Sequence, residues 1–277
     1  MIKREDIRIR DPFIYTDKEE GCYYMYGTTA LIPGTMSTNP SFSCYKTYDL
    51  ENFEGPFVIF DGSGDDFWAD RDFWAPEMHK YNGKYYLFAT CYNPKFGRGT
   101  QIFVCDTPDG KYKPMTERPI TPAGWDCLDG TLYIDNGKPY MVFCHEWSQV
   151  GDGEILAMPL KDDLSAPDGE PVLLFKASEN PEVWELEKGK GTYVTDGPFL
   201  WNEDGKIKMI WSSFNEFDYM VLEAEADSLL GKWKHSGSKF DFDGGHAMLF
   251  NTLEGKRMIS LHRPNMADLE RAFFYEY

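Results

Sequence analysis

The chain has 277 residues, a formal net charge of -18 and a pI near 4.6. This acidity argues against nucleic acid or an anionic membrane surface as a partner. A chain of this length can bury a core without disulfide or metal staples, and its 16% aromatic content favours strands and also supplies platforms for sugar rings.

Cysteine usage and the N-terminal segment bear on the compartment. Six cysteines are spread through strand-like segments, with no Cys-x-x-Cys pair and no metal-ligand spacing. We interpret most of them as small buried hydrophobic side chains in a reducing environment. The segment 1–6 lacks the apolar region of a signal peptide, and no apolar run approaches a membrane span. The sequence as given predicts a cytoplasmic protein.

Five hairpins of one layout follow each other along the chain. In each, a polar residue leads into an aromatic or apolar strand, a turn containing Gly follows, and a second strand runs back. The second hairpin is the clearest, with strands predicted at 78–81 and 85–90 and a turn at Asn82-Gly83. The polar residues at the five starting points are Asp11, Glu77, Asp129, Asp196 and His246.

The spacing of these hairpins predicts the fold. Five units of about 55 residues have room for four strands each, as the blades of a propeller require. A sandwich or barrel also shows closely spaced hairpins, but does not explain a polar residue at the same point of every unit. We therefore predict an all-β fold, a five-bladed β-propeller, as one domain spanning 1–277. The five polar residues are expected to converge on one face around the axis.

Two segments outside the hairpins have weaker patterns. Residues 2–10 alternate weakly, with Ile7 and Ile9 as the apolar positions, and are expected to form an edge strand that closes the ring against the last blade. Residues 178–191 contain four glutamates and are either a short helix or a loop excursion before the fourth unit.

The motifs resemble those of glycoside hydrolase family 43 over nearly the whole chain. The matching phrases, in order, are Arg10-Asp11-Pro12-Phe13, Phe73-Trp74-Ala75-Pro76-Glu77-Met78-His79, the Asp129 segment, Asp196-Gly197-Pro198-Phe199 and Gly244-Gly245-His246. The resemblance implies a five-bladed propeller and inverting hydrolysis of arabinofuranosides or xylosides. A fructosidase-like propeller is less consistent, because its Asn-Asp-Pro and Glu-Cys-Pro phrases are absent.

Inverting hydrolysis needs a carboxylate as general base and a carboxylic acid as general acid, about 6.5–9.5 Å apart. Acids on nearby blades can span that distance. By the resemblance, Asp11 matches the general base, and Asp129 matches a third carboxylate that raises the pKa of the acid and orients it. For each aspartate alone, capping of a turn is the alternative role.

The general acid is where the chain departs from the family. The family usually places Glu before Gly-Pro in the fourth unit, whereas this chain has Asp196, shorter by about 1.5 Å of reach. Glu146, at the exit of the second strand of the third unit, is an equal candidate. A third hypothesis is a site without catalysis.

Three further residues are candidates for binding, and His246 for a metal. Trp74 is either a sugar platform or a core residue. Glu77 is expected to line the channel, as a ligand or as an acceptor that holds other groups. Arg263 could fork onto sugar hydroxyls or a catalytic carboxylate, or form a structural salt bridge. In relatives the histidine matching His246 can ligate a central calcium or hydrated ion, although a satisfied core imidazole is commoner.

The sequence thus favours a glycosidase of the α-L-arabinofuranosidase or β-xylosidase type, acting on an oligosaccharide or glycoside. No organic cofactor is expected, and by the resemblance the candidate ion at the axis is calcium. The alternative is a non-catalytic carbohydrate-binding propeller, suggested by the missing glutamate at Asp196.

Overall fold

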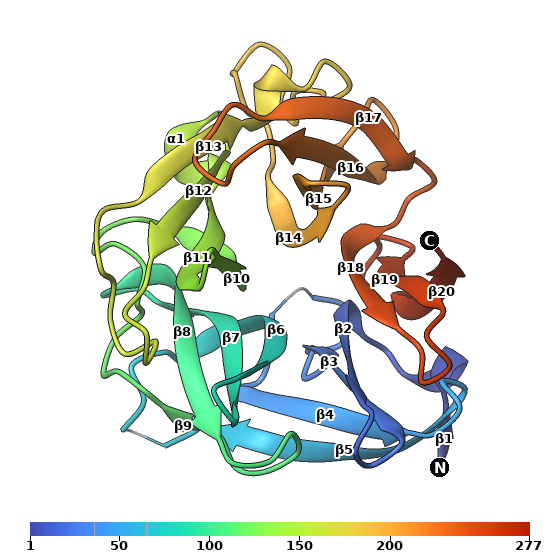
Figure 1. Cartoon of the computed structure of the whole chain (residues 1–277). Coiled ribbons are helices and arrows are strands. Elements are labelled where there is room, and N and C mark those ends of the chain that lie inside the picture. Colours follow the sequence, from blue (N-terminus) through green and yellow to red (C-terminus); the bar gives the residue numbers. More distant parts are fainter. Residues whose placement is uncertain (36, 65) are drawn as a thin grey trace.

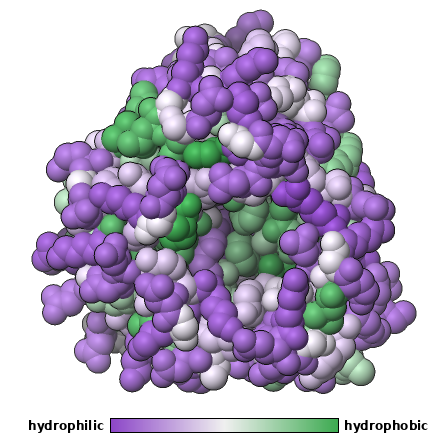
Figure 2. Space-filling model, in the orientation of Figure 1, coloured by the Kyte–Doolittle hydropathy of each residue, from purple (hydrophilic) through white to green (hydrophobic). Residues whose placement is uncertain are grey.

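A computed structural model describes residues 1–35, 37–64 and 66–277. Five antiparallel sheets stand in a ring around a central axis, as Figure 1 shows, and the predicted five-bladed β-propeller is confirmed. The ring is hollowed at its centre, with apolar side chains visible inside (Figure 2). None of the helices among these residues is long and apolar enough to cross a membrane.

The strands follow each other from the axis outward in each sheet, except for β1. The first sheet has the order β1-β5-β4-β3-β2, the next three have four strands each and the last has three. The bounds are β1 Ile2–Lys3, β2 Arg10–Asp17, β3 Cys22–Thr28, β4 Ser41–Thr47 and β5 Asn52–Asp61; β6 Arg71–Tyr81, β7 Lys84–Asn93, β8 Gly97–Cys105 and β9 Lys113–Pro114; β10 Cys127–Asp135, β11 Lys138–His145, β12 Glu154–Pro159 and β13 Val172–Lys176; β14 Asp196–Glu203, β15 Lys206–Phe214, β16 Tyr219–Ala226 and β17 Lys234–Phe240; β18 Gly245–Asn251, β19 Arg257–Arg263 and β20 Arg271–Glu276.

Helical structure is confined to short connections. The α-helix α1 comprises Trp147–Val150, and 3-10 turns occupy Arg4–Asp6 and Ala177–Glu179. The excursion at 178–191 therefore begins in a 3-10 turn and continues without a helix.

Local sequence explains the inner hairpins. At the turns Asn82-Gly83 and Asn136-Gly137, both residues have positive φ, between 47° and 82°. Such turns match the twist of the flanking strands, and Asn and Gly tolerate this conformation. Behind the hairpins, buried side chains from neighbouring sheets pack against one another, and Trp211 is the largest one that is wholly buried. The core therefore lies between the blades.

Each innermost strand contains a bulge near its start. At the bulge one residue adopts a positive φ of 44–55° and the pairing with the second strand shifts. A bulge re-aims the side chains beside it. One such residue in each strand is Asp11, Ala75, Asp129, Gly197 or His246, and β6 has a further bulge at Asp72, with φ 55°. Two of the five polar residues that start the predicted hairpins do not have this conformation themselves. Asp196 precedes Gly197 by one position, and Glu77 follows Ala75 by two.

In four of the five blades, a hydrogen bond to the preceding blade holds the bulge in place. The backbone N–H of the bulge residue donates to a side chain on the second strand of that blade, at 2.8–3.2 Å. The donor and acceptor pairs are Ala75 with Thr28 Oγ1, Asp129 with Thr90 Oγ1, His246 with Ser212 Oγ, and Asp11 with His262 Nδ1. In the fourth blade, Gly197 N–H donates instead to Asp129 Oδ2 at 3.0 Å.

The N-terminal segment does not close the ring as predicted. β1 pairs with β5 of the first sheet, so the expected edge strand against the last blade is wrong. Residues 4–6 turn as a 3-10 segment and interrupt the strand, while Ile7 and Ile9 enter the core. One backbone hydrogen bond, from Ile9 N–H to Glu270 O at 3.3 Å, joins the N-terminal segment to the last sheet. Side chains also hold this seam: Arg10 ion-pairs with the buried Glu270 at 3.2 Å, and Ser260 Oγ donates to Pro12 O at 2.8 Å.

Candidate active site

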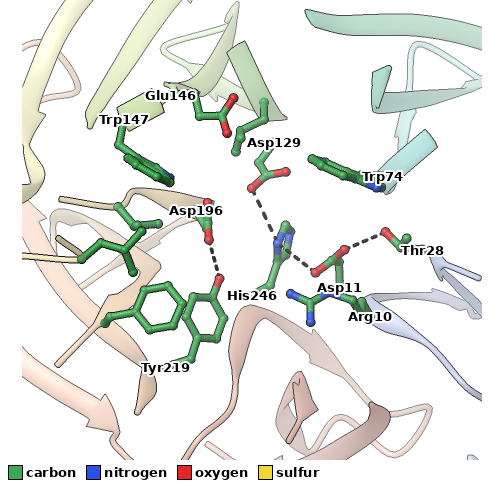
Figure 3. Close-up of a pocket in the computed structure, with 14 residues that line it drawn as sticks. Arg10, Asp11, Thr28, Trp74, Asp129, Glu146, Trp147, Asp196, Tyr219 and His246 are labelled. Carbon is green, nitrogen blue, oxygen red and sulfur yellow. Dashed lines mark hydrogen bonds and ion pairs between the residues drawn. The ribbon is translucent and has the colours of Figure 1, made fainter. Parts of the chain in front are cut away.

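A pocket of about 310 Å³ opens at one end of the axis, with walls from all five sheets (Figure 3). It brings together six of the eight predicted site residues. Arg10, Thr28, Trp147 and Tyr219 also line it and were not predicted. The predicted residues in the pocket are Asp11, Trp74, Asp129, Glu146, Asp196 and His246.

Asp11 is held as a carboxylate. Thr28 Oγ1 donates to its Oδ2 at 2.6 Å, and His246 Nδ1 lies 3.3 Å from its Oδ1. Burial acts to raise the pKa of Asp11, but the charges of His246 and Arg10 outweigh it and the pKa is lowered overall. His262 is buried next to Arg10, which lowers its pKa to about 3, so its neutral Nδ1 can accept the Asp11 N–H at 3.2 Å. Asp11 therefore has the ionisation state of a base.

The pKa values of Asp129 and Asp196, in contrast, are raised. Burial raises the pKa of Asp129 to about 7, with repulsion from Asp196 and Asp11 adding to the effect. Burial raises the pKa of Asp196 to about 6, with Glu146 and Asp11 adding repulsion, although Tyr219 Oη donates to its Oδ2 at 2.9 Å. The two carboxyls interact and titrate as a pair. A proton can therefore stay in this part of the pocket at mildly acidic pH.

Glu146 lies in the pocket under different constraints. It ion-pairs with Arg98 Nη1, while Arg98 Nη2 lies 2.9 Å from Asp72 Oδ2. The Arg98 guanidinium also stands 4.6 Å over the Trp74 ring. The ion pair requires the ionised form of Glu146, which competes with the protonated form that a general acid needs. Trp74 lines the pocket and is half-buried, which is the position a sugar platform requires.

Two predicted binding residues lie elsewhere. Glu77 is buried and its Oε2 lies 3.3 Å from His79 Nε2, so it is an internal partner of a histidine and not part of the pocket wall. Arg263 donates to Phe242 O at 3.3 Å and stands 4.6 Å over the Phe242 ring. The expected fork of Arg263 onto a sugar or a catalytic carboxylate is thus absent from the described pocket, where Arg10 supplies the guanidinium.

Of the unpredicted wall residues, Arg10 had a partial signal in the sequence and Tyr219 had none. Arg10 belongs to the quoted Arg-Asp-Pro phrase, but the sequence did not indicate that its side chain would lie beside Asp11. Tyr219 begins β16, a third strand with no repeated motif. No periodicity in the sequence could therefore have placed its hydroxyl on Asp196.

His246 is oriented toward carboxylates, as the dashed lines in Figure 3 show. Its Nδ1 lies 3.3 Å from Asp11 Oδ1 and 3.7 Å from Asp129 Oδ2. Burial acts to lower its pKa, but these carboxylates, together with Glu77 and Asp196, raise it overall. Within 1–35, 37–64 and 66–277, no group of three or more His, Cys, Asp or Glu side chains could hold a metal ion. A calcium ion beside His246 would take most of its six to eight oxygen ligands from water or backbone carbonyls.

We expect removal of divalent cations to leave the protein active. Because His246 serves as a cationic partner of two carboxylates, dialysis against EDTA should change kcat/KM by less than about twofold. The measurement is turnover of an aryl pentoside before and after dialysis, with the melting temperature as a control for folding. A loss of activity that added calcium reverses would contradict this expectation.

Comparisons with known proteins agree with this geometry. The family model of glycosyl hydrolases family 43 matches residues 6–274. A solved endo-arabinase from Bacteroides thetaiotaomicron is 40% identical, with a TM-score of 0.91, and the match covers 100% of this chain and 96% of that one.

Two curated relatives match over shorter segments. Xylosidase/arabinosidase 43A of Humicola insolens is 28% identical over 109 residues, which are 37% of this chain and 32% of the relative. A probable arabinan endo-1,5-alpha-L-arabinosidase C of Aspergillus clavatus is 24% identical over 171 residues, 57% of this chain and 47% of the relative. The chain thus spans a third to a half of the length of these two relatives. The family match over nearly the whole chain is decisive, and the protein belongs to glycosyl hydrolases family 43.

Proposed function

We propose that the protein hydrolyses O-glycosidic bonds of pentose-type sugars with inversion, with Asp11 as general base and Asp196 as general acid. The observation that carries this proposal is that one pocket shifts the pKa values of two carboxyls in opposite directions. The pKa of Asp11 is lowered, while that of Asp196 is raised to about 6. Acid and base roles are separated by environments of this kind.

Proton transfer follows from these contacts. Asp11, ionised beside His246 and Arg10, takes a proton from the attacking water as its oxygen bonds to the anomeric carbon. Asp196 delivers a proton to the leaving oxygen as the glycosidic bond breaks. Asp129 Oδ2 accepts the N–H of Gly197, the residue after Asp196, at 3.0 Å and so holds the backbone that carries the acid. Asp129 is therefore a positioning residue.

Asp196 is preferred to Glu146 as the acid because of their partners. Tyr219 donates a neutral hydrogen bond to Asp196, whereas Glu146 is bound by the cationic Arg98. A guanidinium stabilises a carboxylate more strongly than a phenol does. We assign Glu146 to the wall of the pocket, where with Arg98 it fixes the position of Trp74.

The substrate we propose first is an arabinan or an arabino-oligosaccharide. The 40% identical structure described above is an endo-arabinase and covers this whole chain. The test is a panel of aryl α-L-arabinofuranoside, β-D-xyloside and β-D-galactofuranoside, with linear arabino- and xylo-oligosaccharides. Hydrolysis of a pentoside with inversion, followed by NMR, would support the proposal. Binding without turnover on every sugar would favour the carbohydrate-binding alternative.

We expect activity to fall as the pH rises above about 6–7. The general acid must be protonated, and Asp196, with a pKa raised to about 6, loses its proton through this range. The base must be ionised, and because the pKa of Asp11 is lowered, the acidic limb should lie below about pH 4. The kcat/KM profile on an oligosaccharide measures both limbs. A profile that stays flat from pH 5 to pH 9 would contradict the assignment of Asp196.

A further inference from the structure

A second cavity, of about 450 Å³, lies beside the active-site pocket. Its walls come from the connection between β7 and β8 and from the segment that precedes β10. The short helix α1 stands between the two cavities, because Trp147 lines the pocket and Gln149 lines the second cavity. We call this cavity the Trp125 groove, after the indole in its wall; its size suits one or two sugar rings.

The groove carries positive charges without acidic partners. Lys95 Nζ stands 5.0 Å and the Arg118 guanidinium 5.2 Å from the centre of the Phe96 ring. Both side chains are exposed, and in the described part of the chain neither forms an ion pair. Such an arrangement is unexpected in a protein with 46 acidic and 28 basic residues. Distant charges of the molecule are screened beyond about 8 Å at physiological salt, so an anion in the groove interacts mainly with the charged groups that line it.

The other charged groups in the groove are already paired. Arg98 binds Asp72 and Glu146, and Asp126 Oδ1 accepts the backbone N–H of Arg98 at 2.9 Å. The Asp126 carboxylate would repel an anion, but its position is fixed by this hydrogen bond. Lys95 and Arg118 are therefore the groups available to an anionic ligand.

Flat aromatic side chains complete the walls. The Trp125 indole stacks on the His145 imidazole with ring centres 4.2 Å apart and an angle of 5° between the planes. His145 is itself fixed, with Nδ1 3.1 Å from Glu154 Oε2 and Nε2 2.7 Å from Gln149 Oε1. The indole that lines the groove is thus held rigidly. Sugar rings stack on such platforms through their C–H faces.

We propose that the Trp125 groove binds an acidic sugar residue, a pyranose ring that bears a carboxylate, in the same glycan whose pentosidic bond occupies the active-site pocket. The ring would stack against the aromatic wall and the carboxylate would pair with Lys95 and Arg118. Only the helix α1, of one turn, separates the groove from the pocket, so one glycan can reach both. This placement in the same glycan rests on the proposed function. The binding of an acidic sugar does not depend on turnover.

The first experiment measures binding of trigalacturonate to the full chain by calorimetry. The neutral counterpart, in which the carboxyls are reduced to alcohols, tests the contribution of the sugar rings alone. Citrate tests the contribution of the negative charge alone. We expect trigalacturonate to bind at least about tenfold more tightly than either probe, and its affinity to fall as salt is raised. Equal affinity for the neutral oligomer or for citrate would overturn the proposal.

Variants locate the binding. The double substitution Lys95→Glu with Arg118→Glu should weaken trigalacturonate binding at least about tenfold, because two attractive contacts become repulsive. Lys95→Arg with Arg118→Lys keeps both charges and should retain affinity within about threefold. Lys232→Glu with Lys234→Glu makes the same charge change at exposed positions before and at the start of β17, and this variant should also retain affinity within about threefold. Unchanged binding in the first double variant would refute the groove as the site.

Activity separates this inference from the proposed function. The Lys95→Glu, Arg118→Glu variant should hydrolyse a neutral aryl pentoside within about twofold of the parent, since neither residue lines the pocket. Trigalacturonate binding that responds to these substitutions in a protein inactive on all pentosides would support the groove and refute the proposed function. Pentosidase activity without any trigalacturonate binding would do the reverse.

Discussion

Asp11→Asn is expected to lower kcat on pentosides by about 10²–10⁴-fold while the protein stays folded. The amide has the shape of the carboxylate, so it can still accept the Thr28 hydroxyl that lies 2.6 Å from Oδ2. It cannot take a proton from water, and it removes the negative charge that faces His246 at 3.3 Å. The measurement is steady-state turnover of an aryl arabinofuranoside, with circular dichroism and oligosaccharide binding to verify the fold and the pocket.

A matched control is available on the exposed turn between β14 and β15. Asp204 also has positive φ, 51°, and Asp204→Asn makes the same chemical change far from the pocket, in a conformation that Asn tolerates. This variant should retain the activity of the parent. Turnover by Asp11→Asn within about tenfold of the parent, with the control unaffected, would remove Asp11 from the role of base.

Asp196→Ala is expected to impair hydrolysis of sugar–sugar bonds about 10²–10⁴-fold and that of a dinitrophenyl pentoside by less than about tenfold. An alkoxide leaves slowly without a proton, whereas dinitrophenolate leaves unaided, so only loss of the acid separates the two substrates. Loss of a residue that merely binds sugar would affect both alike. The measurement is kcat/KM of one variant on both substrates.

Glu146→Ala is the comparison that decides between the two candidate acids. Because Glu146 is bound by Arg98, its removal should disturb the guanidinium over Trp74 and slow both substrates by similar factors. If the substrate-dependent loss appears in Glu146→Ala and is absent in Asp196→Ala, the acid is Glu146. Its absence from both variants would mean that neither residue donates the proton.

The repeated hairpins made the blade count predictable, because Asn-Gly turns and polar starting residues depend on local sequence. Asp11 and Asp129 were predictable for the same reason. The exact register at Glu77 was not, since a bulge adds one residue to a strand and shifts its alternation. The positive φ at Ala75, two residues earlier, is set by the Thr28 hydroxyl of the preceding blade. Contacts between blades are not visible in a local pattern.

Arg263 illustrates a second limit of the sequence. Its position at the exit of an inner hairpin was predicted from the repeat, but the direction of a long side chain depends on what surrounds it. The Phe242 ring lies beside it and offers a face for stacking, 4.6 Å from the guanidinium. The same holds for the N-terminal segment, where the weak alternation of Ile7 and Ile9 did not indicate that residues 2–3 would pair with β5.

Asp11, the proposed base, depends on contacts from both the first and the last sheet. Asp11 lies at the seam of the ring, where its N–H is held by His262 of the last sheet and its neighbour Arg10 pairs with Glu270. A chain with only the first four blades folded would contain nearly every residue of the pocket, but Asp11 would keep its Thr28 hydrogen bond and lack the contacts from His246 and His262. If Asp11 is the base as proposed, we expect activity to appear only after the last sheet has docked against the first.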